Sequence, residues 1–192
     1  MNKQLCNKRI FDIIFSLLML IFSLLPFILI FIILLYSTRG NCFYFSKRVG
    51  LNNQYFLMPK FRTMYDNTPE VATEILKNPK LQITVIGRIL RKTSLDELPQ
   101  IWSVLKGDMS IVGPRPALYN QFELIKERTN LNINKIKPGI TGWAQINGRD
   151  MISTRQKIQY DLYYINNMSC KFDIYIIILT ATKVIYNKDI SH

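Results

Sequence analysis

With 192 residues, the chain can form one domain with an attached membrane segment, but not a multi-spanning transporter with a separate catalytic domain. Lysine and arginine number 25 against 13 aspartate and glutamate; this net charge of +12 indicates phosphorylated, anionic-lipid or nucleic-acid partners, or general lysine enrichment. The only histidine is His192, and Cys6, Cys42 and Cys170 are widely spaced, which argues against histidine-based catalysis, histidine metal sites and a disulfide framework.

An uncharged apolar run extends over residues 13–36 and is long enough to cross a hydrocarbon core of about 30 Å. Pro26, near its middle, predicts a bend. Basic residues on both sides would keep both flanks in the cytoplasm, which a single crossing cannot do. Two interpretations are therefore open: a re-entrant helix-break-helix that leaves by the leaflet it entered, or a crossing helix with a proline kink.

Aromatic and β-branched residues around a Gly-Leu-Asn-Asn turn predict a β-hairpin formed by Cys42–Val49 and Gln54–Phe61. It brings several basic residues close together. A solvated edge strand, on which basic side chains are common, is one explanation for them. A phosphate-contact role for Lys60 and Arg62 becomes the better interpretation only if they face the acidic pair described below. Residues 66–80 are polar, contain two prolines and predict a loop.

Helical spacing of apolar residues predicts a helix from residue 81 to 92 and a second amphipathic helix that ends at Gly107. The start of the second helix is set by Pro99. With Asp96 as its N-cap, Pro99 would be the third helical residue, whose missing N–H is unpaired in any helix. Asp96 and Glu97 are then expected at the positive end of this helix.

This acidic pair has two interpretations. Acids commonly cap helices, and Ser94-x-x-Glu97 fits a capping box. A helix N-terminus also binds phosphate, a carboxylate can attack phosphorus, and a neighbouring carboxylate can hold Mg²⁺ with substrate phosphates. In the same way, Arg115 between two prolines is either a solvated residue in a rigid turn or a restrained anion contact.

Downstream, residues 116–129 predict a helix, and a glycine-rich segment follows over residues 138–150. In this segment Arg149 is either a phosphate contact or part of a surface ion pair. The apolar and then amphipathic residues 171–188 are too few to span a bilayer. They predict an interfacial helix whose lysines, Lys171, Lys183 and Lys188, reach lipid headgroups.

Five ordered motifs resemble those of the bacterial sugar transferases, the small monotopic phosphoglycosyl transferases. The resemblance extends from about Lys8 to Asn187, and its motifs are KRIFD (8–12), KFRTM (60–64), SLDELPQ (94–100), KGDMSIVGPRP (106–116) and PGITGWAQINGR (138–149). One departure is that Leu25, rather than the family's usual serine, precedes Pro26.

The resemblance implies transfer of a sugar-1-phosphate from a UDP-sugar to undecaprenyl phosphate, with release of UMP, as the first membrane step of a surface glycan pathway. By analogy, Asp96 would attack the β-phosphorus to form a covalent phosphosugar intermediate, and Glu97 would help to hold Mg²⁺. Arg115 would lie at the nucleotide-sugar site. At matching motif positions, the phosphate contacts that the resemblance implies are Lys60, Arg62, Arg91 and Arg149.

We therefore expect a mainly helical α+β fold, with residues 1–40 as a re-entrant membrane helix and residues 41–192 as a cytoplasmic catalytic domain. This domain would carry the small β-hairpin and interfacial amphipathic helices, at the inner membrane of a bacterium. The expected partners are the UDP-sugar, undecaprenyl phosphate and membrane lipids; no nucleic-acid module is recognisable. The alternative is a membrane-tethered basic binding protein without catalysis.

Overall fold

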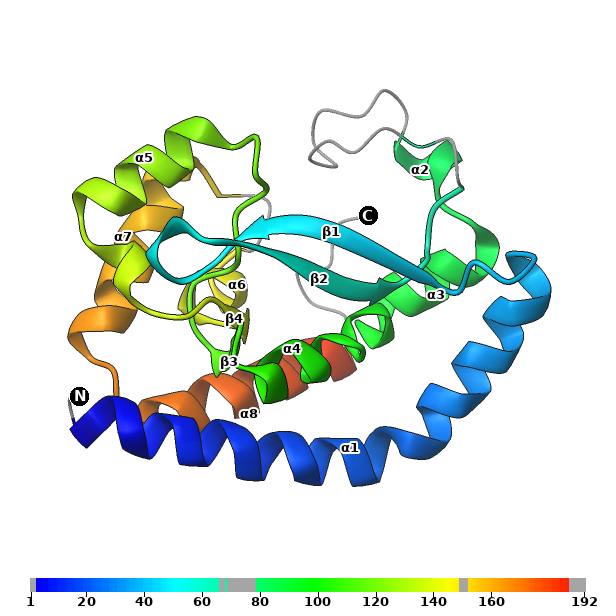
Figure 1. The fold of residues 1–192 in the computed structure, drawn as a ribbon, viewed down its shortest axis with the longest axis horizontal. Helices are drawn as coiled ribbons and strands as arrows, with labels where there is room; N and C mark the ends of the chain where they lie inside the picture. Colours follow the sequence, from blue (N-terminus) through cyan, green and yellow to red (C-terminus); the bar gives the residue numbers. More distant parts are fainter. Residues whose placement is uncertain (1–2, 66–67, 69–78, 149–151, 187–192) are drawn as a thin grey trace.

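The computed structural model describes residues 3–65, 68, 79–148 and 152–186 (Figure 1). Helices predominate over two small sheets, so the expected mainly helical α+β class is confirmed. In chain order the elements are α1 Lys3–Ser37, β1 Phe43–Val49, β2 Tyr55–Phe61, α2 Pro79–Gln82, α3 Val85–Lys92, α4 Gln100–Lys106, β3 Ser110–Val112, α5 Phe122–Asn130, β4 Gly139–Thr141, α6 Trp143–Ile146, α7 Thr154–Asn166 and α8 Cys170–Tyr186. Short 3-10 turns occupy Leu51–Asn53, Leu95–Glu97 and Ile133–Lys135.

Helix α1 contains Asn7–Ser37, the one described helical segment that is long and apolar enough to cross a membrane. Figure 1 shows that it runs along one side of the molecule and bends in its second half. Pro26 lies inside the helix, and the helical conformation continues through it. The predicted bend is thus present, whereas the predicted interruption is not observed, because one proline removes only one of the helix's hydrogen bonds.

The first turns of α1 are joined to the globular part by buried polar contacts. The Arg9 guanidinium donates to the backbone oxygens of Val104 and Leu105 at the end of α4, at 2.6 and 2.8 Å. Asp12, which is 2 % exposed, accepts hydrogen bonds from the backbone N–H of Ile111 and from a serine hydroxyl in β3. These contacts satisfy carbonyls at a helix end and fix α1 against α4 and β3.

The last turns of α1 also pack on the globular part. Ile30 and Leu34 are buried in one hydrophobic cluster with Phe61 of β2 and Leu90 of α3. Between the two attached ends, apolar side chains are exposed; Phe22, for example, is 81 % exposed. Helix α1 therefore contacts the same body at both ends and exposes an apolar surface between them.

The predicted hairpin is confirmed, and each of its strands begins one residue later than expected. Strands β1 and β2 pair antiparallel, with Tyr44 opposite Lys60. Figure 1 shows this hairpin lying over α4, with α5 and α7 near its turn and α3 near its open end. The hairpin thus extends from one end of the globular part to the other and carries Lys60 toward the segment before α4.

A second sheet, in which β3 and β4 pair parallel, was not predicted, because strands of three residues leave no periodic pattern. Its backbones approach closely: a Cβ on Gly139 would overlap the backbone of Gly113. Glycine is required at this contact for lack of space. The pairing sets the turn that contains Arg115 beside the glycine-rich segment.

The start of α4 differs from the prediction. Pro99 is the N-cap of α4, and the acids lie before it on the separate 3-10 turn Leu95–Glu97. Asp96 as N-cap is therefore wrong, and Ser94 makes no side-chain capping bond. Ser94 has φ of 56°, a left-handed conformation that redirects the chain before the acids. The helix prediction over residues 116–129 was also too early, since α5 begins at Phe122.

Candidate active site

Asp96 and Glu97 lie side by side on the 3-10 turn between α3 and α4. Although they are charged, they are only 7 and 8 % exposed. Buried carboxylates require compensating charge or hydrogen bonds, because desolvation penalises their ionised form. The surroundings of the pair provide cations from two other elements.

Lys60, from β2, is the first of these cations. Its Nζ lies 2.7 Å from Glu97 Oε1 and 3.8 Å from Asp96 Oδ2. Burial lowers the pKa of Lys60 below its usual 10.5, while the two carboxylates act in the opposite direction. Lys60 faces the acidic pair, which is the condition that favoured a phosphate-contact role.

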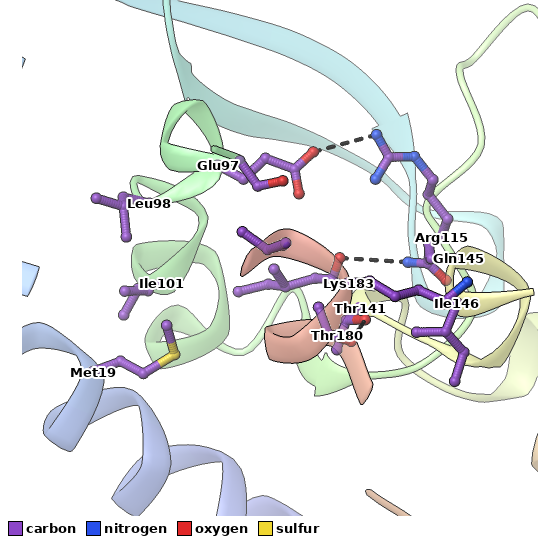
Figure 2. A pocket seen from close by; sticks show the side chains of 13 residues that line it. Met19, Glu97, Leu98, Ile101, Arg115, Thr141, Gln145, Ile146, Thr180 and Lys183 are labelled. Carbon is purple, nitrogen blue, oxygen red and sulfur yellow. Dashed lines mark hydrogen bonds and ion pairs between the residues drawn. The ribbon is translucent and has the colours of Figure 1, made fainter. Parts of the chain in front are cut away.

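Arg115 provides the second cation, from the rigid turn after β3. Its Nη2 lies 3.3 Å from Glu97 Oε1 (Figure 2). The backbone oxygen of Arg115 accepts a 2.8 Å hydrogen bond from Nη1 of Arg128 in α5. Arg128 in turn pairs with the buried Asp161 of α7 at 2.7 Å. Arg115 is therefore held in place by the chain behind it as well as by its flanking prolines.

Asp161 lies deep behind the Arg115 turn. Burial raises the pKa of its carboxyl, and the charge and hydrogen bonds of Arg128 oppose that rise. This buried pair was not predicted. The sequence shows only that an arginine and an aspartate lie in two helical segments. Many surface residues of opposite charge fit the same description.

The other predicted phosphate contacts have different surroundings. Arg62 donates through Nε and Nη2 to backbone oxygens at and just before the start of β1, at 3.0 and 3.3 Å. Arg91 donates through Nε to the Thr63 hydroxyl at 2.9 Å. These contacts join the open end of the hairpin to its neighbours. Arg149 lies outside the described residues.

A cavity of about 150 Å³ opens beside Glu97 and Arg115. Figure 2 shows the side chains around it, which come from α1, the 3-10 turn, α4, the segment around β4 and α6, and α8. Its apolar lining consists of Met19, Leu98, Ile101, Ile140, Ile146 and Val184, and its other lining residues include Thr141, Gln145, Thr180 and Lys183.

The α8 residues of this cavity were not predicted, and Lys183 was expected to reach lipid headgroups. The structure places Lys183 in the lining of the cavity, and its contact with headgroups stays a prediction. A signal was present: Ile176, Thr180 and Val184 are spaced four residues apart, which puts them on one helical face. Ile176 is fully buried, so this face of α8 turns toward the protein.

The acidic pair also bears on metal binding. Within the described residues, no group of three or more His, Cys, Asp or Glu side chains forms a candidate metal site. Mg²⁺, however, is commonly held by one or two carboxylates while substrate phosphates and waters supply its other ligands. Two adjacent buried carboxylates in a cationic surround therefore fit Mg²⁺ bound together with a phosphorylated substrate.

The chain is similar to known proteins along almost its whole length. Residues 3–187 match the family described as "Bacterial sugar transferase". The chain is 38% identical to the "Uncharacterized sugar transferase EpsL" of Bacillus subtilis, over 95% of this chain and 89% of that protein. It is 36% identical to the undecaprenyl-phosphate galactose phosphotransferase of Salmonella typhimurium, over 95% of this chain and 41% of that protein. It is also 42% identical to the UDP-glucose:undecaprenyl-phosphate glucose-1-phosphate transferase of Xanthomonas campestris, over 79% of this chain and 33% of that protein.

Proposed function

The chain belongs to the bacterial sugar transferase family, and we propose that it transfers a sugar-1-phosphate from a UDP-sugar to undecaprenyl phosphate and releases UMP. The observation that carries this proposal is the buried pair Asp96–Glu97. Lys60 and Arg115 contact this pair, and Glu97 and Arg115 line a cavity that α1 also lines. This arrangement combines a nucleophile, phosphate-binding cations and access from the membrane segment.

In the first step, a carboxylate oxygen of Asp96 attacks the β-phosphorus of the UDP-sugar. A phosphorus–oxygen bond forms to Asp96, and the bond to the bridging oxygen breaks, so UMP leaves with the electron pair. Lys60 and Arg115 stabilise the charge on the phosphate oxygens. Their positions within 4 Å of the acidic pair support this role.

In the second step, an oxygen of the lipid phosphate attacks the phosphorus of the phosphosugar on Asp96. The new bond joins two phosphates, and the aspartate carboxylate leaves unchanged, ready for another cycle. Glu97, beside Asp96, would hold Mg²⁺, which supplies positive charge against the phosphate oxygens when bound. In both steps the two acids thus have different roles: Asp96 carries the phosphosugar, and Glu97 would hold the metal.

The shape of α1 supports a re-entrant topology, and the basic residues on both of its flanks favour the cytoplasmic face for the catalytic part. Arg9 and Asp12 attach one end of α1 to α4 and β3. At the other end, Leu34 packs in the hydrophobic cluster that contains Phe61 of β2. A straight crossing helix would separate these ends by the thickness of the bilayer. The exposed apolar residues between them, such as Phe22, would enter one leaflet.

The rival function is a basic, membrane-tethered binding protein. A binder of anionic lipid would gain nothing from two buried acids that neutralise its own cations, which makes this function the weaker proposal. The experiment that separates the two measures UMP release from a panel of UDP-sugars, with undecaprenyl phosphate, in Mg²⁺ or in EDTA. We expect release with at least one UDP-sugar and only in Mg²⁺; no release with any of them would favour the binding protein.

A further inference from the structure

We propose that the cavity beside Glu97 receives the isoprene units nearest the phosphate of the lipid acceptor, so that α1 forms one wall of the acceptor site. This inference rests on the proposed transferase function. It assigns the membrane helix a part in substrate recognition that goes beyond anchoring. The cavity volume of about 150 Å³ suits only a short segment of a long polyprenyl chain, and the remainder would extend into the lipid.

The apolar part of the cavity lining suits a hydrocarbon. Met19 comes from α1, Ile101 from α4 and Val184 from α8, so three helices contribute hydrocarbon to one space. A sugar ring presents hydroxyl groups and would leave such a wall without suitable partners. A branched hydrocarbon is stabilised there, because each CH₂ group that it buries leaves water.

The opposite end of the cavity is polar. Figure 2 shows Glu97 and Arg115 at one end of the lining side chains and Met19 at another. Lys183 of α8 is a further cation in the cavity lining. An amphiphile with a phosphate at one end and hydrocarbon behind it matches this distribution, and its phosphate would then lie near the acidic pair.

Helix α8 is fixed in the position that this site requires. The hydroxyl oxygens of Thr180 in α8 and Thr141 in β4 are 2.7 Å apart and share a hydrogen bond. At the start of α8, Asp173 pairs with Lys8 of α1 at 2.7 Å. Two of the helices that line the cavity, α1 and α8, are thus joined directly by an ion pair.

The test is to fill part of the cavity with a larger side chain on α8. Val184→Trp adds an indole at the cavity, and Ile178→Trp is the matched control, because Ile178 lies on the same helix and is 56 % exposed. Steady-state kinetics would give KM separately for undecaprenyl phosphate and for the UDP-sugar. We expect Val184→Trp to raise KM for undecaprenyl phosphate about tenfold or more and to change KM for the UDP-sugar less than about twofold, whereas the control changes neither.

Farnesyl phosphate, which has only the units nearest the phosphate, should show the same loss of affinity in Val184→Trp. Met19→Trp fills the cavity from α1 and provides the same test if the α8 variant does not fold. An unchanged KM for both lipid phosphates in a folded cavity variant would overturn the inference, as would an effect confined to the UDP-sugar. Absence of transfer in the unmodified enzyme would instead overturn the proposed function on which the inference rests.

Discussion

The Lys60 ammonium lies 2.7 Å from Glu97 Oε1, which joins the hairpin to the acidic turn through one buried ion pair. A lysine held in this way compensates two carboxylates in the absence of substrate. When a diphosphate binds, the same ammonium can contact its oxygens. The pair thus connects the stability of the site with its ability to bind phosphate.

The first prediction concerns pH. Because burial lowers the pKa of Lys60 below 10.5, the ammonium loses its proton in the folded enzyme at a lower pH than a free lysine would. We therefore expect kcat/KM for the UDP-sugar to fall on the alkaline side below pH 10.5. Lys60→Arg should move this fall to higher pH, since arginine remains charged, and Lys60→Gln should lower activity at every pH. An alkaline limb unchanged in Lys60→Arg would show that another group titrates.

The second prediction concerns Arg115. Loss of a charged hydrogen bond to a phosphate costs about 1.5–3 kcal/mol, so Arg115→Gln should raise KM for the UDP-sugar by roughly tenfold to a hundredfold. Arg115→Lys keeps the charge but not the planar fork and should recover only part of this loss. Steady-state kinetics with varied UDP-sugar measures both. The exposed Arg155 of α7 provides the control, Arg155→Gln, for which we expect wild-type KM.

The third prediction concerns the structural role of the pair Arg128–Asp161. Arg128→Met leaves Asp161 buried without its cation, and breaking such a pair costs about 3–5 kcal/mol. We expect a loss of that size in the free energy of unfolding, measured by denaturant titration in detergent. Lys126→Met, on the exposed side of the same helix, should be close to wild type. A stability equal to that of the control would contradict the structural role assigned to the pair.

The fourth prediction concerns topology. If α1 is re-entrant, a cysteine at position 2 lies on the cytoplasmic side, in a chain whose own cysteines have been replaced by serine. A membrane-impermeant maleimide should then label it only after the inner membrane is permeabilised. A periplasmic marker protein labelled in the same intact cells serves as the control. Labelling of position 2 before permeabilisation would support the crossing helix.

Local sequence patterns predicted the elements that local forces determine. The apolar run, the bend at Pro26 and the hairpin follow from composition, from a lost hydrogen bond and from turn residues. The acidic pair was identified, but its exact placement was wrong by one element. Ser94 has a left-handed conformation, and after it the chain forms a separate 3-10 turn that contains the acids. No propensity rule anticipates such a conformation for serine.

Long-range contacts account for what the sequence could not predict. The place of Lys183 in the cavity lining was not predicted, because it depends on the packing of one α8 face against β4. The pairing of Arg128 with Asp161 connects segments 33 residues apart. Such contacts depend on how helices meet in space, which hydrophobic periodicity does not specify.

The central claim is that Asp96 carries the phosphosugar. The most direct measurement is intact and peptide mass spectrometry of enzyme quenched after incubation with UDP-sugar and Mg²⁺, without a lipid acceptor. We expect a mass increase of one sugar phosphate on the peptide that contains Asp96, its loss when undecaprenyl phosphate is added, and none in Asp96→Asn, which should still sediment with membranes. An adduct on another residue, or one that persists in Asp96→Asn, would contradict the account.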